Sequence, residues 1–211
     1  NEKIKNALRK SASYEQSISP AALETRSIYI YIPDEKLKIY GDLLRIITAQ
    51  SMEYFSSRPP ENKQTILFCL DEFASFGKLQ IVESLRKLRK RRIRILVLTQ
   101  SVSDVDMIYG KDERKAMLGN FKFTVILGCK DTETQEYFSK MIGEKRSLLA
   151  TDPYQKPHPI IKPADLAHLE QDLFVICDDG AIRLKKNFYF KQKWLPHERV
   201  AIRIVLCQMI R

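Results

Sequence analysis

Short apolar runs alternate with amphipathic segments along most of the chain. Three of the runs, TILFCLDE (65–72), IRILVLTQ (93–100) and FTVILGC (123–129), are continuously apolar and of strand length. Strands buried on both faces of a parallel sheet have this pattern. An earlier segment, SIYIYI (27–32), is β-branched and aromatic and predicts a further strand.

The segments between these runs place apolar residues at helical spacing. Helices are predicted over residues 34 to about 57, from about 79 to before 92, over 103–109, 112–120 and 132–142. Asp34 and Asp131 are candidate N-caps, and Gly143 closes the last of these helices. Strands that alternate with helices in this way predict an α/β fold with a mostly parallel sheet and helices on both faces.

The two ends of the chain and the region after residue 143 lack this alternation of strand and helix patterns. Residues 144–163 contain four prolines and predict a long loop, followed by a short helix at 164–168. The dipeptide Asp179-Gly180 lies between two strand-like runs and predicts a β-hairpin. Residues 1–26 are polar with a short helical pattern, and the tail from Trp194 fits either helix or strand.

Composition narrows the class of protein. The chain of 211 residues is 44% hydrophobic and 29% charged, which excludes a disordered chain and a disulfide scaffold. No apolar run approaches the roughly 18 residues of a membrane span. Neither the four cysteines nor the three histidines have metal-ligand spacing, so no zinc site is predicted.

The net charge of +10 is unevenly distributed. From Arg86 to Arg94 the sequence reads RKLRKRRIR, with seven cationic residues and no acid. Clustered cations suggest a polyanionic partner, whereas a solvated helix face is the alternative. Lys87 and Lys90 fall opposite the apolar face of their helix, where they would be free to bind phosphate.

Polar side chains end two of the predicted buried strands. Asp71 and Glu72 follow four apolar residues, which is the pattern of a Walker B segment, although acids also end strands as simple caps. In that segment the first acid holds Mg²⁺ and the second activates the water that attacks the γ-phosphate. Gln100 ends the next strand, on the same edge of a parallel sheet, where ligands bind.

The phosphate-binding loop that should accompany these acids is missing. No GxxxxGK[ST] sequence occurs in the 211 residues, because Gly77-Lys78 is followed by Leu79 and Gly143 by Glu144. Either the protein is no nucleotide hydrolase, or the loop lies upstream of Asn1. Without this loop we expect no ATPase activity from the isolated chain.

Several separated blocks together resemble one family. LFCLDEFASFGKL, ESLRKLRKRRIRILVLTQS, IYGKD and LGNFKFTVILGCKDTETQEYFSKMIGEK, followed by PADLAHLEQDLFVICDDGAIRLKKNFYF, resemble the type IV coupling proteins (VirD4/TraG/TraD-like) of bacterial conjugation. The match covers most of residues 27–193 in order, and nothing is recognised after Trp194.

The resemblance implies a RecA-like P-loop nucleotide-binding domain interrupted by an all-α domain. Residues 1–26 would be the end of the all-α insertion, 27–193 the C-terminal part of the RecA-like domain ending in a β-hairpin, and 194–211 an unassigned tail. The whole protein would bind ATP and Mg²⁺, form a hexamer on the cytoplasmic face of the bacterial inner membrane, and have its Walker A loop and membrane anchor upstream. It would recruit relaxase-bound single-stranded DNA, with its accessory proteins, or protein effectors, and pump them into a type IV secretion channel.

Residue roles follow from the same resemblance. Asp71 matches the acid associated with Mg²⁺, Glu72 the catalytic acid, and Gln100 the glutamine of the following strand. Arg89 matches an arginine that reaches the nucleotide of the neighbouring subunit, with Lys90 or Arg91 as alternatives because the turn after it lacks the family's glycine. The clustered charge of the basic run, in turn, makes Lys87, Lys90 and Arg91 the candidate DNA contacts.

Two alternatives remain from the sequence. The fragment would act instead as a docking module for relaxosome accessory proteins, or belong to another RecA-type DNA translocase, of the FtsK or HerA kind. The IYGKD and FSKMIGEK blocks favour the conjugation family.

Overall fold

The computed structural model describes residues 19–62, 64–145 and 157–188, which belong to two compact units. The first unit holds residues up to 100 and 104–121, and the second holds 101–103 and the residues from 122. The predictions for residues 1–18 and for the tail from 189 lie outside the described residues. No helix within the described ranges combines the length and apolar content needed to cross a bilayer.

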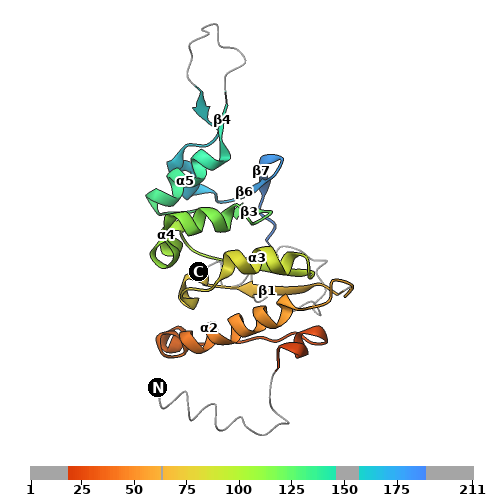
Figure 1. Cartoon of the computed structure of the whole chain (residues 1–211). Coiled ribbons are helices and arrows are strands. Elements are labelled where there is room, and N and C mark those ends of the chain that lie inside the picture. Colours follow the sequence, from red (N-terminus) through yellow and green to blue (C-terminus); the bar gives the residue numbers. More distant parts are fainter. Residues whose placement is uncertain (1–18, 63, 146–156, 189–211) are drawn as a thin grey trace. The chain divides into compact units, whose positions relative to one another are not determined.

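Along the chain of the first unit, helices come before, between and after two short strands (Figure 1). Its elements are η2 (Pro20–Glu24), α2 (Asp34–Ser56), β1 (Ile66–Leu70), η3 (Phe73–Phe76), α3 (Ile81–Arg89), β2 (Ile93–Val97) and most of α4 (Val102–Leu118).

Strands β1 and β2 pair in parallel, with Ile66 opposite Ile93 and Leu70 opposite Val97. One face of this pair joins the core formed with α2 and α3, in which Phe55 and Leu88 are fully buried. The predicted strand–helix–strand order from residue 65 to residue 100 is therefore confirmed.

The opposite face of the pair is exposed. Leu67 is 58% and Leu96 41% exposed, although the apolar runs predicted burial on both faces. Within the described residues, helices cover only the face that carries Ile66 and Ile93.

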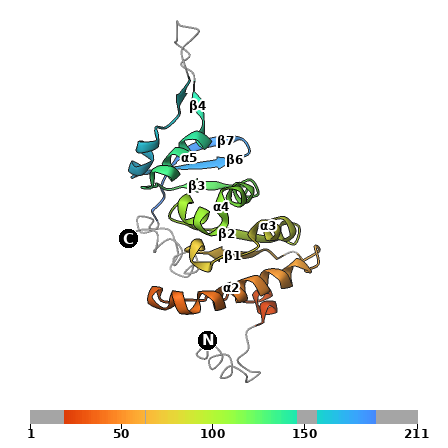
Figure 2. The ribbon, with the colours of Figure 1, turned by 60° about the vertical axis from the view of Figure 1, so that its left-hand side comes forward.

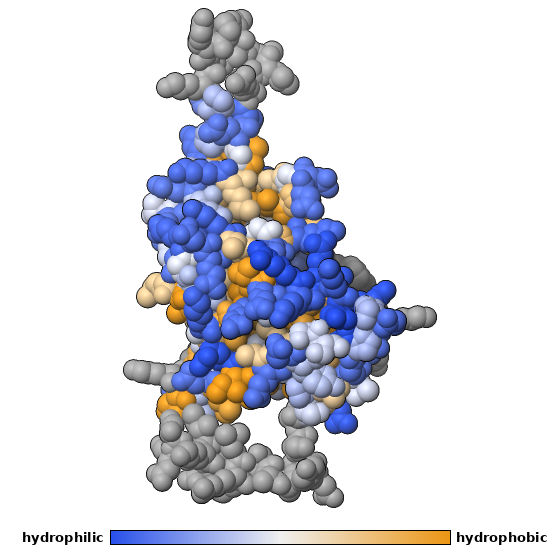
Figure 3. Space-filling model, in the orientation of Figure 1, coloured by the Kyte–Doolittle hydropathy of each residue, from blue (hydrophilic) through white to orange (hydrophobic). Residues whose placement is uncertain are grey.

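The strand predicted at residues 27–32 does not form among the described residues. Tyr29 and Tyr31 are 60% and 77% exposed, and Figure 3 shows apolar atoms gathered near the start of α2, which follows this segment. An extended segment needs a neighbouring ladder for its backbone N–H and C=O groups, and no described strand pairs with this one.

Two helix predictions gain detail. Helix α2 begins at Asp34 itself, with Pro33 as its N-cap residue, so Asp34 is not the cap. The helices predicted at 103–109 and 112–120 are the two halves of α4, which is broken at Gly110 with φ 76° and ψ 161°. Glycine reaches this positive φ without the steric penalty of a side chain.

The second unit is built around a three-stranded sheet. Its elements are β3 (Thr124–Ile126), α5 (Thr132–Ile142), β4 (Glu144–Lys145), β5 (His158–Pro159), η4 (Pro163–His168), β6 (Asp172–Cys177) and β7 (Gly180–Lys185). The sheet order is β3-β6-β7, and both of its pairings are antiparallel. The prediction of mostly parallel pairing thus holds for β1 and β2, whereas β3 pairs antiparallel with β6.

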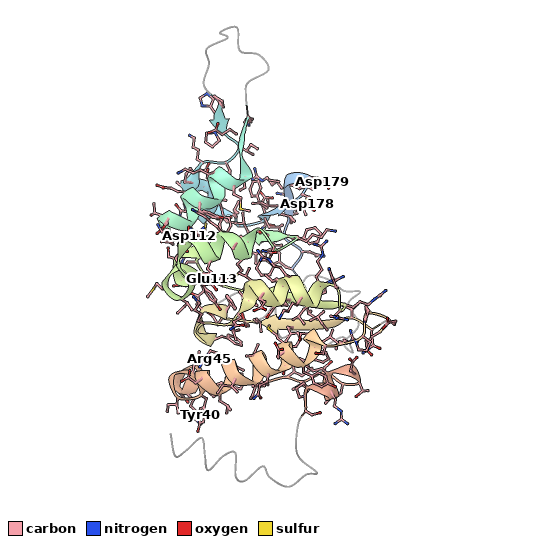
Figure 4. The ribbon with its side chains drawn as sticks, viewed as in Figure 1. Tyr40, Arg45, Asp112, Glu113, Asp178 and Asp179 are labelled. Atoms are coloured by element: carbon pink, nitrogen blue, oxygen red, sulfur yellow. The ribbon has the colours of Figure 1, made fainter. Side chains whose placement is uncertain are left out.

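The hairpin and the helix of this unit follow the sequence signals closely. The two-residue turn is Asp178-Asp179, and Gly180 opens β7 with φ 114° (Figures 2 and 4). Helix α5 has the predicted bounds, and the Asp131 side chain accepts a hydrogen bond from the backbone N–H of Thr134. In the predicted loop 144–163, the described ends pair as β4 and β5.

Candidate functional site

The candidate site lies where β1 and β2 end. Beyond the last ladder pair, the backbone N–H of Leu98 donates to the carbonyl oxygen of Leu70 over 3.0 Å, and the N–H of Phe73 donates to the carbonyl oxygen of Leu98 over 2.9 Å. These two bonds keep the chains paired past the carboxyl ends of the strands. Residues 71–72 are therefore held beside residues 99–100.

Glu72 and Gln100 meet at this edge. The Nε2 of Gln100 donates to the Oε1 of Glu72 over 2.9 Å, and both side chains are exposed. The half-buried Asp71 is oriented locally, because its Oδ1 accepts the backbone N–H of Glu72 over 3.1 Å. The predicted juxtaposition of the acidic pair and the glutamine is present in the structure.

Glu72 has a left-handed backbone, with φ 50° and ψ 51°. Residues other than glycine adopt this region at a cost of about 1–3 kcal/mol, and such residues cluster at functional sites. The conformation turns the chain sharply after β1 and leaves both carboxylates at the carboxyl edge of the strands. Gln100 is the neutral donor beside them.

The acids of this edge are suited to a metal ion that is bound only in part by protein side chains. Among the described residues there is no group of three or more His, Cys, Asp and Glu side chains that could hold a metal ion. Mg²⁺ is commonly bound by one or two carboxylates together with water and substrate phosphates. Asp71 and Glu72 therefore suit a Mg²⁺ ion that is shared with a nucleotide, and not a metal caged by protein alone.

Arg89 lies at the opposite end of the strands from these acids. It is the last residue of α3 and precedes Ile93, where β2 begins, so it lies near the amino ends of the strands. Asp71, Glu72 and Gln100 follow the carboxyl ends. Among the contacts of the described residues, none joins Arg89 to these three side chains.

The basic run covers the end of α3 and the turn into β2, and the surface over α3 is mainly hydrophilic (Figure 3). Lys87 forms an ion pair with Glu83, one helical turn earlier, over 2.7 Å. The hydrogen bond and charge of Glu83 raise the pKa of Lys87, and those of Lys87 lower the pKa of Glu83. Lys90 is exposed and Arg91 is half-buried.

The turn at the centre of the basic run is anchored by an arginine that sequence analysis did not single out. Arg58 is 4% exposed and donates to the carbonyl oxygens of Gln64 and Arg91, each over 2.9 Å. It also binds both carboxylate oxygens of Glu24, over 2.7 and 2.6 Å. No sequence signal points to this role, because Glu24 and Arg91 are far from Arg58 along the chain and two of the acceptors are backbone oxygens.

In the second unit a polar cluster joins the start of α4 to the start of α5. The Oδ2 of Asp131 accepts hydrogen bonds from the hydroxyls of Thr134 and Ser103, over 2.5 and 2.8 Å. These hydrogen bonds, led by that of Thr134, lower the pKa of Asp131. Since Thr134 is 1% exposed and also accepts the N–H of Val102, this cluster is a helix cap and not a second reactive site.

Solved structures of plasmid coupling proteins share this fold. The plasmid coupling protein TrwB in complex with the non-hydrolysable GTP analogue GDPNP matches with a TM-score of 0.71 at 24% identity, over 84% of this chain and 45% of that chain. TrwB in complex with ADP and Mg²⁺ matches with a TM-score of 0.68, again at 24% identity and with the same coverage of both chains. The predicted RecA-like fold is confirmed.

The sequence comparisons give the family. The model of the TraM recognition site of TraD and TraG matches residues 65–171, half of the chain, and the chain belongs to this family of conjugative coupling proteins. Protein VirD4 of Agrobacterium fabrum is 23% identical over 186 residues, which cover 80% of this chain and 28% of the relative. The chain thus spans less than a third of that relative's length.

Proposed function

We propose that this chain forms the Walker B side of a coupling ATPase, which moves relaxase-bound single-stranded DNA or protein effectors into a type IV secretion channel. The observation that carries the proposal is the contact between Gln100 and Glu72 at the carboxyl edge of β1 and β2. Ligands of open α/β sheets bind at this edge. The membership in the coupling-protein family supports the assignment of the transported cargo.

The side chains of the edge have distinct roles in this proposal. Glu72 accepts a proton from the attacking water, and Gln100 holds that water through its amide while it is hydrogen-bonded to Glu72. Asp71, whose Oδ1 accepts the N–H of Glu72, would hold Mg²⁺, and the ion would supply charge neutralisation for the phosphates of bound ATP. The exposure of Glu72 and Gln100 leaves both side chains accessible to a nucleotide.

The remaining parts of the site come from outside these 211 residues. The chain has no GxxxxGK[ST] loop and matches 28% of the VirD4 relative and 45% of the TrwB chain. We infer that a longer protein supplies the phosphate-binding loop and the anchor that holds it at the cytoplasmic face of the inner membrane. Its hexameric ring brings neighbouring subunits together at each nucleotide.

Arg89 acts across the subunit boundary in this assembly. Its place near the amino ends of the strands separates it from Glu72 of its own chain, which supports action in trans. A positively charged finger of this kind stabilises the charge of the transition state and is worth about 10³–10⁵ in rate. Lys87, Lys90 and Arg91 are then candidate contacts for the phosphates of the transferred strand.

The docking of accessory proteins is the second candidate function. The matching family is the TraM recognition site of TraD and TraG, and the match covers β1, β2 and the second unit as far as Gln171, just before β6 begins. A docking module needs the surface of these units but does not need the charge of Glu72. The two candidates therefore make different demands on Glu72.

The test is Glu72→Gln in the longer protein. The variant keeps an oxygen that accepts from Gln100 but loses the carboxylate that takes the proton, so we expect ATP binding to persist and kcat to fall about 10²–10⁴-fold. Glu136→Gln, an exposed glutamate of α5, is the matched control and should leave kcat unchanged. Normal hydrolysis by Glu72→Gln would contradict the ATPase role, and normal conjugative transfer by a hydrolysis-dead Glu72→Gln would leave docking as the function.

Mixed assemblies test the role of Arg89. Glu72→Gln and Arg89→Ala subunits in one hexamer create some sites with an intact acid from one chain and an intact arginine from its neighbour. We expect mixing to restore part of the ATPase activity that each variant lacks alone. If confirmed mixed hexamers show no recovery, Arg89 does not act in trans.

A further inference from the structure

The loop that follows Glu72 is fixed by buried side chains. Phe73 is fully buried, and Phe76 and Leu79 are 8% and 3% exposed. Between them Gly77 has a φ of 67°, which allows the chain to turn back toward α3. The loop 73–79 is thus part of the core of the first unit, although it directly follows the exposed Glu72.

One side chain from α4 contacts both ends of this loop. The ring of Tyr109 stacks on that of Phe73, with centroids 5.3 Å apart and planes 10° apart. Its hydroxyl donates to the carbonyl oxygen of Gly77 over 3.2 Å and accepts the N–H of Leu79 over 3.1 Å. Tyr109 is 5% exposed, and burial raises the pKa of its hydroxyl.

The backbone of Glu72 depends on the position of Phe73. The Phe73 N–H is held by Leu98, and its ring is held by Tyr109, so the residue is fixed at both its backbone and its side chain. The carbonyl oxygen of Glu72 in turn accepts the N–H of Ser75 over 2.8 Å. A strained left-handed residue persists when its surroundings fix it, and these contacts supply that constraint.

A second link joins the same loop to α4 at the surface. Lys78 pairs with Glu113 over 2.7 Å, and Glu113 lies on α4 beyond the break at Gly110 (Figure 4). Lys78 is 62% exposed in this pair, so the contribution to stability is small. The buried contacts of Tyr109 therefore provide the stronger connection between the loop and α4.

We propose that Tyr109 is a positioning residue for Glu72, and that its stack on Phe73 and its hydroxyl bridge to Gly77 and Leu79 hold the loop that sets the left-handed backbone of the catalytic acid. The effect of Tyr109 on catalysis rests on the proposed function, whereas its effect on the conformation of the loop does not. Tyr109 itself does not touch the reacting atoms.

Tyr109→Phe in the longer protein tests the proposal. The substitution keeps the aromatic stack but removes the hydroxyl bridge, so the fold is retained while the loop loosens. We expect kcat for ATP to fall about tenfold with KM unchanged, because small displacements of a catalytic group are costly in rate. Tyr54→Phe, which changes a 50% exposed tyrosine of α2, is the matched control and should leave kcat unchanged. An unchanged kcat in Tyr109→Phe would overturn the proposal.

The Glu72→Gln background separates positioning from a general structural effect. If Tyr109 acts through Glu72, Tyr109→Phe should reduce the residual rate of Glu72→Gln by less than twofold. An equal tenfold loss in both backgrounds would overturn the proposal.

Amide hydrogen exchange gives a readout that does not depend on hydrolysis. In Tyr109→Phe we expect faster exchange at the Leu79 amide, which loses its acceptor, and at the Ser75 amide, which bonds Glu72. Faster exchange at Leu79 with unchanged exchange at Ser75 would show that the constraint does not reach Glu72. Should Glu72→Gln hydrolyse ATP normally, the proposed function fails, and the Ser75 exchange still decides whether Tyr109 positions Glu72.

Discussion

Arg92 has a backbone conformation that favours glycine, with φ 58°. It lies in the turn between α3 and β2, where the chain reverses within a few residues. A side chain at positive φ is strained by contact with its own backbone. The turn therefore holds an arginine at a position whose backbone conformation favours glycine.

The strain at Arg92 is measurable with two substitutions. Both Arg92→Gly and Arg92→Ala remove the guanidinium, so their difference reports the backbone alone. We expect the glycine variant to be more stable than the alanine variant by about 0.5–1 kcal/mol, since relief of strain exceeds the added entropy of the unfolded chain. Urea unfolding of the two variants checks this, and an alanine variant of equal or greater stability would contradict it.

Arg58 stabilises the fold through four hydrogen bonds made from a buried position. Arg58→Ala leaves the carboxylate of Glu24 and two backbone oxygens without these donors. We expect a loss of roughly 3 kcal/mol in the free energy of unfolding. Arg45→Ala removes an arginine of α2 (Figure 4) whose side chain is 40% exposed, and should cost less than about 0.5 kcal/mol. Equal losses in urea unfolding would show that Arg58 is not an anchor.

The β6–β7 hairpin carries a charge cluster on neighbouring strands. Asp172 pairs with Arg183 over 2.5 Å and with Lys185 over 2.8 Å. The hydrogen bond from Lys185, followed by that from Arg183, lowers the pKa of Asp172. Protonation of this carboxyl group weakens both contacts.

The hairpin therefore has a defined dependence on pH. The pKa of Asp172 is lower in the folded chain than in the unfolded chain, where it is about 3.9. The ionised Asp172 therefore stabilises the fold fully at a pH above about 3.9, and this stabilisation is lost as the pH falls through the pKa of the folded chain. Asp172→Asn should lower the melting temperature at pH 7, and the difference from the unmodified chain should shrink below about pH 4. Asp178→Asn, in the exposed turn of the same hairpin, is the control. A difference that is constant down to pH 2 would contradict this account.

Helix α5 and the hairpin show which elements local sequence determines. Asp131 caps the helix through Thr134 and Gly143 ends it, so both boundaries depend on neighbouring residues and were predicted correctly. The segment 27–32 has an equally clear strand pattern but pairs with none of the described strands, because a strand depends on a partner that local sequence does not specify. The antiparallel pairing of β3 with β6, about fifty residues later, was missed for the same reason.

The candidate site was predictable because it follows from topology. Parallel strands place their carboxyl ends together, so Glu72 and Gln100 were expected to be neighbours, and their 2.9 Å contact agrees. The roles of Tyr109 and Arg58 were not predictable, since they depend on backbone atoms and rings brought together only by folding.

At the scale of the whole molecule, the excess of positive charge predicts salt-sensitive binding to DNA. If the basic run neutralises phosphates, the affinity for duplex DNA should fall as the salt concentration rises. A plot of the logarithm of the affinity against the logarithm of the salt concentration should have a slope of about −0.9 per phosphate contacted. Lys90→Ala should reduce this slope more than Lys87→Ala, because Glu83 already pairs with Lys87. Fluorescence titrations across salt concentrations check this, and unchanged slopes in both variants would show that the run is only a solvated surface.

The most direct test of the central claim is a structure of the longer protein with a non-hydrolysable ATP analogue and Mg²⁺. The account predicts the γ-phosphate at the carboxyl edge of β1 and β2, with Mg²⁺ beside Asp71 and the position of the attacking water within hydrogen-bond distance of Glu72 and Gln100. Arg89 of a neighbouring subunit should approach the same phosphates. A nucleotide bound elsewhere, with Glu72 and Gln100 facing no phosphate, would contradict the assignment of this edge as the catalytic side of the ATPase.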